Sequence, residues 1–478
     1  MNNDHLCERS NQFSCKATEA KMKQAAWVAV ATLFSGCAAL GPDYTAPELD
    51  PPHKFVGGAT EELFEASSLA WWKSFNDPAL NDLVAIGLDQ NLNVRTAMER
   101  IVAAQENTRL FGLAQQVDGN ASLDARRRET SLGVIDETSS LNADAFFVFD
   151  LFGEFRRSRE KSLAELKAAE FDAGTVKLAY LADVVTSYVL VRYYQLAAQI
   201  TRETITSRRR TLNTARQRAD AQEGTQLEVA QAESLLATAE ASLPILVAQA
   251  RVSTFRIATL LDLPTGTVAD RLKQSRGIPG VKGGSESGIP ADLLRNRPDI
   301  RAAERRLAAA TAAVGVSEAQ LYPSLHLTGS ITAGQTDTWS FGPSLILPVF
   351  DQARRQVARN VALSTARQAE LDHRLAYVSA IEEVQVALTL THARSHQVGA
   401  YSKATSSAER VLNLARRSYE AGVVTIDDVL DAERTRLDNR LNLAQAQSEY
   451  AQAWIQQQVA TGKGWAVVPG RGHVLAQK

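Results

Sequence analysis

Three acidic side chains crowd the start of a predicted helix near the end of the chain. The stretch TIDDVLDAERTR fills residues 425–436, and Asp427 and Asp431 stand four residues apart with a third acid between them. Like charges at that spacing share one helix face and destabilise an isolated helix by about 0.2–0.5 kcal/mol per pair. The helix dipole favours acids in the first turn, which explains the first two acids but not Asp431. Arg434 and Arg436 follow too late to neutralise all three.

Two other groups of residues have types and spacings that catalysis or metal binding would use. Ser158 and Lys161 fit the S-x-x-K spacing of a serine nucleophile, but no companion motif follows and the predicted helix around them is highly charged. His392 and His396 stand at i and i+4, yet neither a third ligand nor an HExxH glutamate accompanies them, which favours a solvated helix face. The sequence has no phosphate-binding loop, so we predict neither an enzyme nor a metal site.

The composition excludes a polyelectrolyte partner and favours helices. The 478 residues carry a net charge of −2, with 45% hydrophobic and 6% aromatic residues, so we predict no nucleic-acid binding. Ala, Leu, Gln, Glu and Arg are abundant, and all of them are strong helix formers. All three cysteines, Cys7, Cys15 and Cys37, lie early, so the chain after residue 37 forms no disulfide.

Residues 21–37, KMKQAAWVAVATLFSGC, have the pattern of a secretory signal peptide, with a basic start and a short apolar run. The ending FSGC resembles a bacterial lipobox, which implies cleavage before Cys37 and attachment of diacylglycerol and palmitate to that cysteine. Ala38 in the next position resembles the choice that sorts lipoproteins to the outer membrane. The alternative is a plain secretory signal with a coincidental cysteine, and Met22 competes with Met1 as the true start.

No later stretch offers 18 uncharged apolar residues, so we predict no transmembrane helix. The most apolar run, residues 176–194, contains Lys177, Asp183 and Arg192. If the chain crosses a membrane, it must therefore do so with β-strands.

The chain contains an internal repeat at an offset near 200 residues. Residues 211–233 align with residues 411–433 without a gap, and nine of the 23 positions are identical. Two further pairs of segments match in the same order, beginning at residues 150 and 348 and at residues 91 and 296. We therefore predict a duplicated unit made of a helix, a strand pair, a very long helix, a tight break and a returning helix.

Each unit contains a strand pair with one apolar and one polar face. Residues 324–333 and 339–349 alternate with a period of two, and residues 141–151 have one continuous apolar face, whereas the partner at residues 119–126 is weaker. Each run is about ten residues long, which suffices for a tilted strand to cross a bilayer. Ordinary half-buried strands of a soluble protein would have the same local pattern.

Long helices follow each strand pair. Residues 155–221 and 352–421 contain no proline, and a helix of about 67 residues would be about 100 Å long. The breaks at residues 223–224 and 421–422 predict two helical hairpins with coiled-coil spacing. Pro244 is expected to kink the shorter returning helix, and residues 264–290 are expected to form a linker.

Four strands are too few to close a barrel, and open sheet edges in lipid cost several kcal/mol per unsatisfied backbone group. Copies of the chain must therefore pool their strands, although this reasoning leaves the number of copies open.

Four segments carry a resemblance to the outer-membrane factor family, in the lipoprotein branch that serves tripartite efflux systems. The resemblance covers nearly the whole chain from Cys37 and implies a trimer with a 12-stranded β-barrel, a periplasmic α-barrel and a mixed equatorial region. The chain departs from the family at the first tip, where Gln222 replaces a glycine. The segments are GPDYTAPELDPP (41–52), LLRNRPDIRAAERRLAAATAAVGVSEAQLYPSLHLTGS (293–330), FGPSLILPVFDQARR (341–355) and YEAGVVTIDDVLDAERTRLD (419–438).

The resemblance implies two sites on the helical hairpins. The gate would consist of Asp431 and Arg434 at the constriction of the tube and Asp427 one turn nearer the tip. Threefold repetition would make rings of carboxylates there, and Arg434 could pair with an acid of a neighbouring subunit. The first repeat has Leu227 and Gln231 at the matching positions, so only one helix pair of each chain would contribute to the gate. The candidates for docking a periplasmic adaptor at the tips are Arg218, Thr225, Gly422, Val423 and Thr425, with a solvated turn as the alternative.

The predicted organisation is a signal peptide (1–36), a lipidated segment (37–78), repeat 1 (79–263), an equatorial linker (264–290), repeat 2 (291–462) and a tail (463–478). An α+β membrane protein of this kind would be the outer-membrane channel of a tripartite efflux pump in a Gram-negative bacterium, extending into the periplasm. Its partners would be an adaptor protein, an inner-membrane RND transporter and membrane lipid. The alternatives are a channel for type I protein secretion and a lipid-tethered periplasmic scaffold.

Overall fold

The computed structural model describes residues 39–47, 70–111, 116–129, 131–133, 135–274, 276–281 and 296–466. The predicted signal peptide and Cys37 lie outside these residues, as does most of the linker after residue 281. The chain divides into two compact units. Unit 1 contains residues up to 47, 103–166 and 305–371, and unit 2 contains residues 48–102, 167–304 and 372–478.

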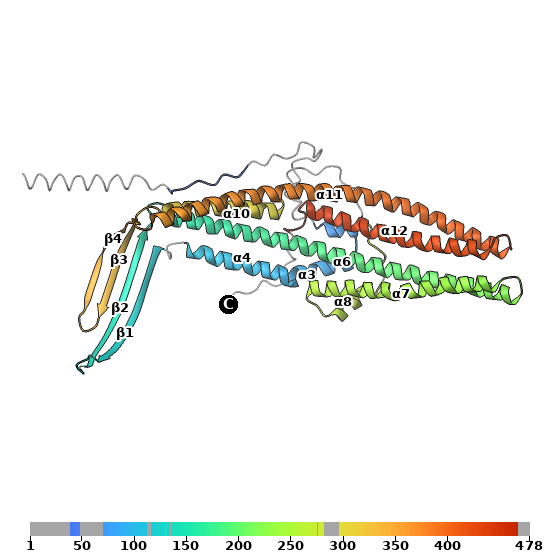
Figure 1. Cartoon of the computed structure of the whole chain (residues 1–478), viewed down its shortest axis with the longest axis horizontal. Helices are drawn as coiled ribbons and strands as arrows, with labels where there is room; N and C mark the ends of the chain where they lie inside the picture. The colour runs from blue at the N-terminus through green and yellow to red at the C-terminus, as the bar shows by residue number, and fades with distance from the viewer. Residues whose placement is uncertain are drawn as a thin grey trace, which may run out of the picture. The chain divides into compact units, whose positions relative to one another are not determined.

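Unit 1 is built around one antiparallel sheet of four strands in the order β1-β2-β3-β4 (Figure 1). The prediction of two strand pairs is confirmed, but β1 has 13 residues and β2 has 15, more than the sequence pattern indicated. Among the described residues, the outer edges of β1 and β4 have no partner strand. The strands are β1 (Val117–Glu129), β2 (Ile135–Phe149), β3 (Ser324–Ala333) and β4 (Thr338–Ile346).

The strand register sorts side chains onto an apolar and a polar face. One row across all four strands joins Ala121, Ala143, Ile331 and Trp339, and Ile331 and Trp339 are 61% and 80% exposed in the single chain. On the other face, Ser330 and Ser340 share a hydrogen bond of 2.8 Å between their hydroxyl groups. A sheet this apolar on an exposed face needs a non-aqueous or protein environment on that side.

Helices make up the rest of the described chain. The two longest were predicted within about one residue at each end, which is within the usual uncertainty of helix boundaries. Strong helix formers without an internal proline account for their length. The helices are η1 (Trp71–Phe75), α3 (Pro78–Gln90), α4 (Leu92–Leu110), α6 (Glu154–Asp220), α7 (Gln226–Leu261), α8 (Thr265–Leu272), α10 (Pro298–Ala319), α11 (Gln352–Glu420) and α12 (Ile426–Ala460).

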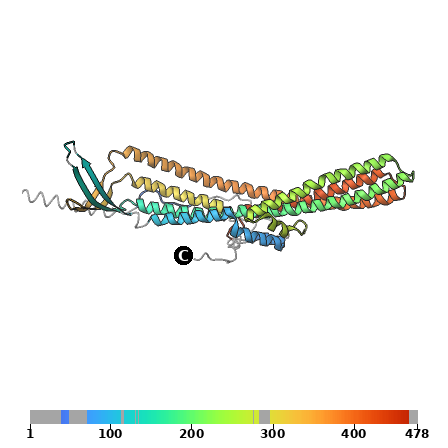
Figure 2. The same cartoon turned by 90° about the horizontal axis from the view of Figure 1, so that it is seen from below.

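Within unit 2, α6 and α7 form one hairpin and α11 and α12 form another, and the two lie side by side (Figures 1 and 2). The two tips turn in the same way, because Gln222 takes φ 65° where Gly422 takes φ 73°. At each tip, a backbone N–H bonds a carbonyl five residues earlier, Glu223 to Arg218 and Val423 to Ser418, both at 2.8 Å. The left-handed conformation costs a non-glycine residue about 1–2 kcal/mol, and Gln222 accepts that cost at the first tip.

The apolar run at residues 176–194 lies in the main core of unit 2. Its side chains pack with residues of η1, α3, α7, α8 and α12, including Trp71, Leu80 and Ile257. A polar network crosses this core, in which the Tyr188 hydroxyl donates to the Asp77 carboxylate and Arg192 donates to the Tyr188 oxygen at 3.0 Å. Burial, with the Asp77 hydrogen bond adding to it, raises the pKa of Tyr188 well above its usual range.

Two helices, α6 and α7, each contain an 18-residue stretch that could cross a membrane by length and composition alone. Each of these stretches contains at most two charged residues, whereas the prediction of no transmembrane helix rested on the lack of any stretch of 18 uncharged apolar residues. In α6, 56% of the stretch is buried, as expected for a core helix, and in α7 only 6% is buried in the single chain.

The region expected to be only a linker begins with a helix. Residues 265–272 form α8, and Val268 and Leu272 of this helix are buried in the core of unit 2. The glycines and prolines after residue 276 dominated the sequence pattern and hid the short amphipathic run before them. Pro244 lies inside α7, which continues on both sides of it.

In unit 1, the segment of residues 39–47 is bound by one arginine at the start of α6. Arg157 is buried and donates hydrogen bonds to the carbonyls of Leu40 at 3.0 Å and Gly41 at 3.2 Å. Its guanidinium also pairs with Asp43 at 2.7 Å. The Arg157 side chain therefore makes three contacts with residues 40–43, and these contacts hold the segment against α6.

Glycines allow the 39–47 segment to approach the backbone of its neighbours. Gly153 takes φ 82°, and a Cβ atom there would lie 2.6 Å from the Cα of Ala39. A Cβ atom on Gly41 would lie 2.5 Å from the Cα of Gly315. Any larger residue at these crossings must push backbone away from backbone.

The variant Gly153→Asp places in repeat 1 the residue that repeat 2 has at the matching position 351. We expect it to release the 39–47 segment and to cost more than the ~1–2 kcal/mol of a left-handed non-glycine residue, because a backbone clash is added. Protease cleavage within the segment should become faster at temperatures where α6 remains folded. Gly133→Ala is the control, because Gly133 has φ 76° but open space around its Cα; equal cleavage in both variants would contradict the clash.

Candidate functional site

The ends of the two helical hairpins share one small apolar core. Leu212 of α6, Ala232 of α7, Leu412 of α11 and Val429 of α12 are all buried in it. Leu212 and Leu412, which occupy matching positions of the two repeats, therefore lie in the same core. This core sets which side chains at the start of α12 point inward and which point outward.

The three acids at the start of α12 have three different environments. Asp428 accepts hydrogen bonds from the Thr425 backbone N–H at 3.0 Å and hydroxyl at 2.8 Å, so it completes the helix cap. Asp427 is exposed, and among the described residues it has no ion pair. Asp431 is 74% exposed and lies 3.5 Å from Arg434 on the same helix.

The two arginines that follow the acids do not neutralise all three, as the sequence indicated. Arg434 reaches back one turn to Asp431 alone, and Arg436 pairs with Glu409 at 3.6 Å. Because both partners are more than half exposed, the Asp431–Arg434 pair contributes at most about 1 kcal/mol and is free to exchange partners.

A groove of about 530 Å³ runs between α7 and α12 beside these residues. Asp427, Asp431 and Arg434 line it from α12, and Leu227 and Gln231 line it from α7. The acids of repeat 2 thus lie across a groove from the neutral residues at the matching positions of repeat 1. Repeat 1 therefore adds no charge to this wall.

The tip candidates divide into residues that hold the turns and residues that remain free. The Arg218 guanidinium donates to the carbonyl of Tyr419 at 2.9 Å and stacks over its ring at 4.7 Å. Burial raises the pKa of the Tyr419 hydroxyl, and Glu228 adds to the rise. Thr225 caps α7, since its hydroxyl accepts from the Glu228 backbone N–H at 3.2 Å. Of the five candidates, Val423 is an apolar side chain that is 76% exposed.

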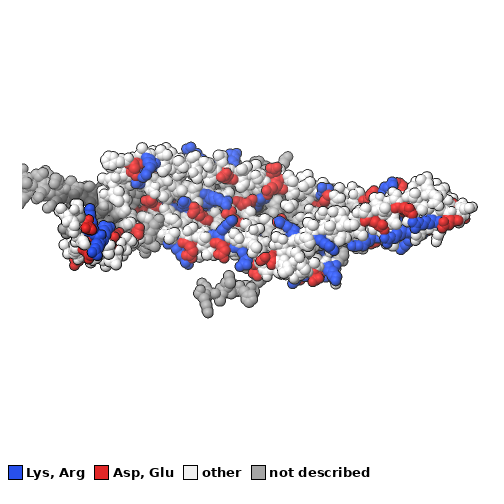
Figure 3. All heavy atoms as spheres, turned by 60° about the horizontal axis from the view of Figure 1, so that its bottom comes forward, with Lys and Arg blue, Asp and Glu red and all other residues white. Residues whose placement is uncertain are grey.

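Charged side chains of both signs cover the hairpin end of unit 2 (Figure 3). Arg209 pairs with Glu240 at 2.6 Å, and Arg216 pairs with Glu233 at 2.5 Å, both between α6 and α7. The charges on this surface are mixed in sign, and exposed apolar residues such as Val423 and Leu227 lie on the same hairpins.

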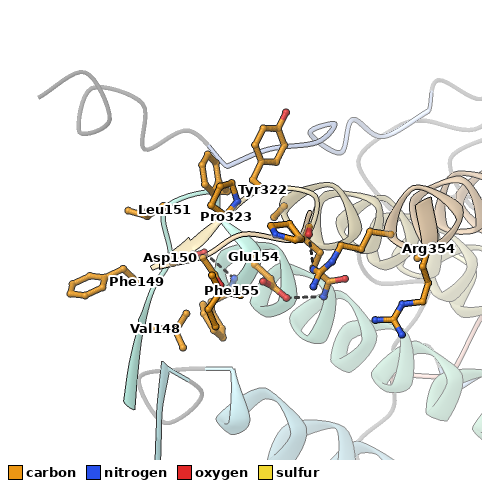
Figure 4. Close-up of a pocket in the computed structure, with 17 residues that line it drawn as sticks. Val148, Phe149, Asp150, Leu151, Glu154, Phe155, Tyr322, Pro323 and Arg354 are labelled. Atoms are coloured by element: carbon orange, nitrogen blue, oxygen red, sulfur yellow. Dashed lines mark hydrogen bonds between the residues drawn. The ribbon is translucent and has the colours of Figure 1, made fainter. Parts of the chain in front are cut away.

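In unit 1, a hollow of about 380 Å³ lies where the strands meet the helices (Figure 4). Asp150 accepts from the backbone N–H of Phe155 at 3.2 Å and so caps the start of α6. Tyr322, 43% exposed, and Arg354, with 84% of its side chain exposed, also line this hollow. Exposed aromatic and basic residues at strand ends are typical of a membrane–water interface.

In the described part of the chain, no side chains are arranged as a catalytic site or a metal site requires. The Nε2 atoms of His392 and His396 lie 3.3 Å apart on an exposed helix face. Among the described residues, no group of three or more His, Cys, Asp or Glu side chains could hold a metal ion.

Replacing Thr225 with Ala should destabilise the start of α7 by about 1 kcal/mol, because the Glu228 backbone N–H loses its acceptor. Amide hydrogen exchange at residues 226–229 should become faster. Thr214→Ala, which removes a hydroxyl bonded only within α6, is the control. Unchanged exchange in Thr225→Ala would mean that this hydroxyl contributes nothing to the cap.

A family model described as outer membrane efflux protein matches residues 83–261 and 289–463. Nodulation protein T of Rhizobium leguminosarum bv. viciae is 37% identical over 444 residues, covering 91% of this chain and 92% of that protein. The pyoverdine export outer membrane protein OpmQ of Pseudomonas aeruginosa is 30% identical over 463 residues, covering 91% of this chain and 96% of that protein.

Solved structures show the same fold. The outer-membrane channel OprN matches with a TM-score of 0.79 and 30% identity, over 90% of this chain and 100% of that one. The CmeC outer membrane channel of Campylobacter jejuni matches with a TM-score of 0.78, over 89% of this chain and 95% of that one, at 20% identity.

Proposed function

The chain belongs to the outer membrane efflux protein family, and from that premise we propose that three copies form the exit duct of a tripartite efflux pump. Members of this family are channels of the Gram-negative outer membrane and not enzymes. The duct would carry small molecules from the periplasm, or from an inner-membrane RND transporter, to the outside.

The observation that carries this proposal is the four-stranded sheet with two open edges and two different faces. In hydrocarbon, the edge groups of β1 and β4 must find backbone partners, and copies of the same sheet supply them. Three copies give twelve strands, with the polar face turned to a water-filled interior and the apolar face turned to lipid. The helical hairpins of the three chains would then continue the duct into the periplasm.

The relatives, and not the site, support the cargo class that we propose. The names of the relatives OpmQ, a pyoverdine export protein, and TtgI, a toluene efflux pump protein, favour small-molecule efflux over protein secretion. An adaptor would dock at the hairpin tips, where Arg218, Thr225, Gly422 and Thr425 shape the turns and Val423 offers an exposed apolar contact. Cys37, outside the described residues, would carry the lipid.

Asp427, Asp431 and Arg434 would form the gate. Threefold repetition turns two exposed acids per chain into rings of carboxylates that attract cations. Because these carboxylates repel one another, Arg434 would have to offset their charge for the constriction to stay narrow. The Asp431–Arg434 pair is exposed and weak, so Arg434 can exchange its own acid for one on a neighbouring chain.

Asp431→Ala and Arg434→Ala should each raise the closed-state conductance in planar bilayers by roughly threefold or more, because each removes one partner of the ion pair that would hold neighbouring chains together in the closed state. Gln231→Ala, at the matching position of repeat 1, is the control. If both gate variants keep the wild-type closed-state conductance, these residues do not form the gate.

Cys37→Ser should leave the protein dependent on detergent for extraction from membranes, because the strands and not the lipid hold it there. The measurement is the fraction released by salt or carbonate compared with the fraction released by detergent. Release into buffer without detergent would contradict the barrel and favour a lipid-tethered scaffold.

A further inference from the structure

We propose that Glu433 is the positioning residue of the gate: a buried carboxylate that holds α12 against α6 and α11 and so fixes where Asp431 and Arg434 point. This inference rests on the gate proposed above and names the contact that orients it. It concerns five residues, here the Glu433 cluster: Ser207, Arg208, Thr211, Arg416 and Glu433.

Glu433 is held by two neighbouring helices at once. Only 3% of the residue is exposed. Its Oε1 atom accepts hydrogen bonds from the Thr211 hydroxyl at 2.8 Å and the Ser207 hydroxyl at 3.1 Å, both on α6. The Arg416 guanidinium of α11 donates to the same oxygen at 2.6 Å. Three donors on one oxygen define a single position for this side chain.

Arg208 extends the cluster to a fourth helix. Its side chain is 4% exposed, and it donates to the Leu235 carbonyl of α7 at 2.6 Å. Its Nε atom lies 4.0 Å from Oε2 of Glu433, and neither of these two atoms has a hydrogen-bond partner. Burial lowers the pKa of the Arg208 guanidinium, and the Glu433 carboxylate opposes that shift.

A buried cluster of this kind does more to fix the position of α12 than to increase the stability of the folded protein. Removing ions from water costs nearly as much as their attraction returns, so well-packed apolar residues would often serve stability equally well. When the helices shift, however, each buried ion moves away from its partner, and the cost of having taken it out of water is no longer offset. The cluster therefore penalises any movement of α12 relative to α6 and α11.

The duplicated unit supplies an internal comparison. Repeat 1 has the same pair at the same spacing, Arg216 and Glu233, at 2.5 Å, but their side chains are 52% and 49% exposed. An exposed ion pair of this kind contributes little to holding two helices together. In repeat 2 the carboxylate of the pair is buried, with 2% of the Glu433 side chain and 34% of the Arg416 side chain exposed, and only there does the same helix carry the gate acids.

The helical geometry links Glu433 to the gate. Successive residues of an α-helix are separated by about 100° around its axis, so Glu433 faces inward while Asp431 and Arg434 face outward, 74% and 57% exposed. A rotation of α12 that redirects the two gate residues must pull Glu433 away from Thr211 and Arg416.

The test is the closed-state conductance of the full-length, lipidated protein in planar bilayers. Arg416→Gln and Glu433→Gln should each raise it by roughly threefold or more, because α12 is released and the gate residues lose their orientation. Arg216→Gln and Glu233→Gln, the matched changes in repeat 1, should leave it at the wild-type value.

A third control separates positioning from stability. Leu412→Ala opens a cavity in the apolar core beside the cluster but removes none of the side chains of the cluster. Thermal unfolding should show it to be at least as destabilised as Arg416→Gln, yet its closed-state conductance should remain that of the wild type. An equal rise in Leu412→Ala would overturn the proposal, because leakage would then follow stability.

The remaining outcomes of the conductance measurements separate a failure of this inference from a failure of the gate assignment. Wild-type conductance in both Arg416→Gln and Glu433→Gln overturns the inference, and if Glu433→Gln fails to assemble, Arg416→Gln decides alone. If Asp431→Ala leaks while Arg416→Gln does not, the gate stands and only this inference fails. If Asp431→Ala does not leak, the gate assignment fails, and any leak in Arg416→Gln must come from elsewhere.

Discussion

Backbone hydrogen bonding in hydrocarbon is the constraint on which the rest of this structure depends. A membrane offers no water to the N–H and C=O groups along β1 and β4, so the sheet of one chain is incomplete by itself. The apolar face with Ile331 and Trp339 and the polar face with Ser330 and Ser340 need different surroundings as well. Assembly of several chains meets both demands.

The sequence predicted the elements whose signals are local. Alternation in residues 324–333 and the absence of proline in residues 352–421 each follow from the geometry of one element, and the structure contains both elements. The turn at Gln222 was harder, because no residue type there signals a left-handed conformation; only its alignment with Gly422 does. The helix α8 was missed because eight residues are too few to stand out beside a glycine-rich stretch.

The environment of the candidate site depended on tertiary contacts and was less predictable. The acids were found from their spacing, but the capping role of Asp428 and the pairing of Asp431 with Arg434 appear only with coordinates. Glu433 carried no signal beyond its identity with Glu233, because burial by α6 and α11 is invisible in the sequence of α12. Glu233 and Glu433 occupy equivalent positions of the duplicated unit, but tertiary packing buries only Glu433.

The glycine crossings of the 39–47 segment have a consequence for the order in which the chain matures. Arg157 and Gly315, which receive this segment, lie more than 100 and more than 270 positions after it in the sequence. Residues that leave the ribosome first thus wait for partners that emerge much later, and closing so long a loop is slow. Docking of the 39–47 segment is therefore a late event, one that reports that both halves of the chain have been exported and have met.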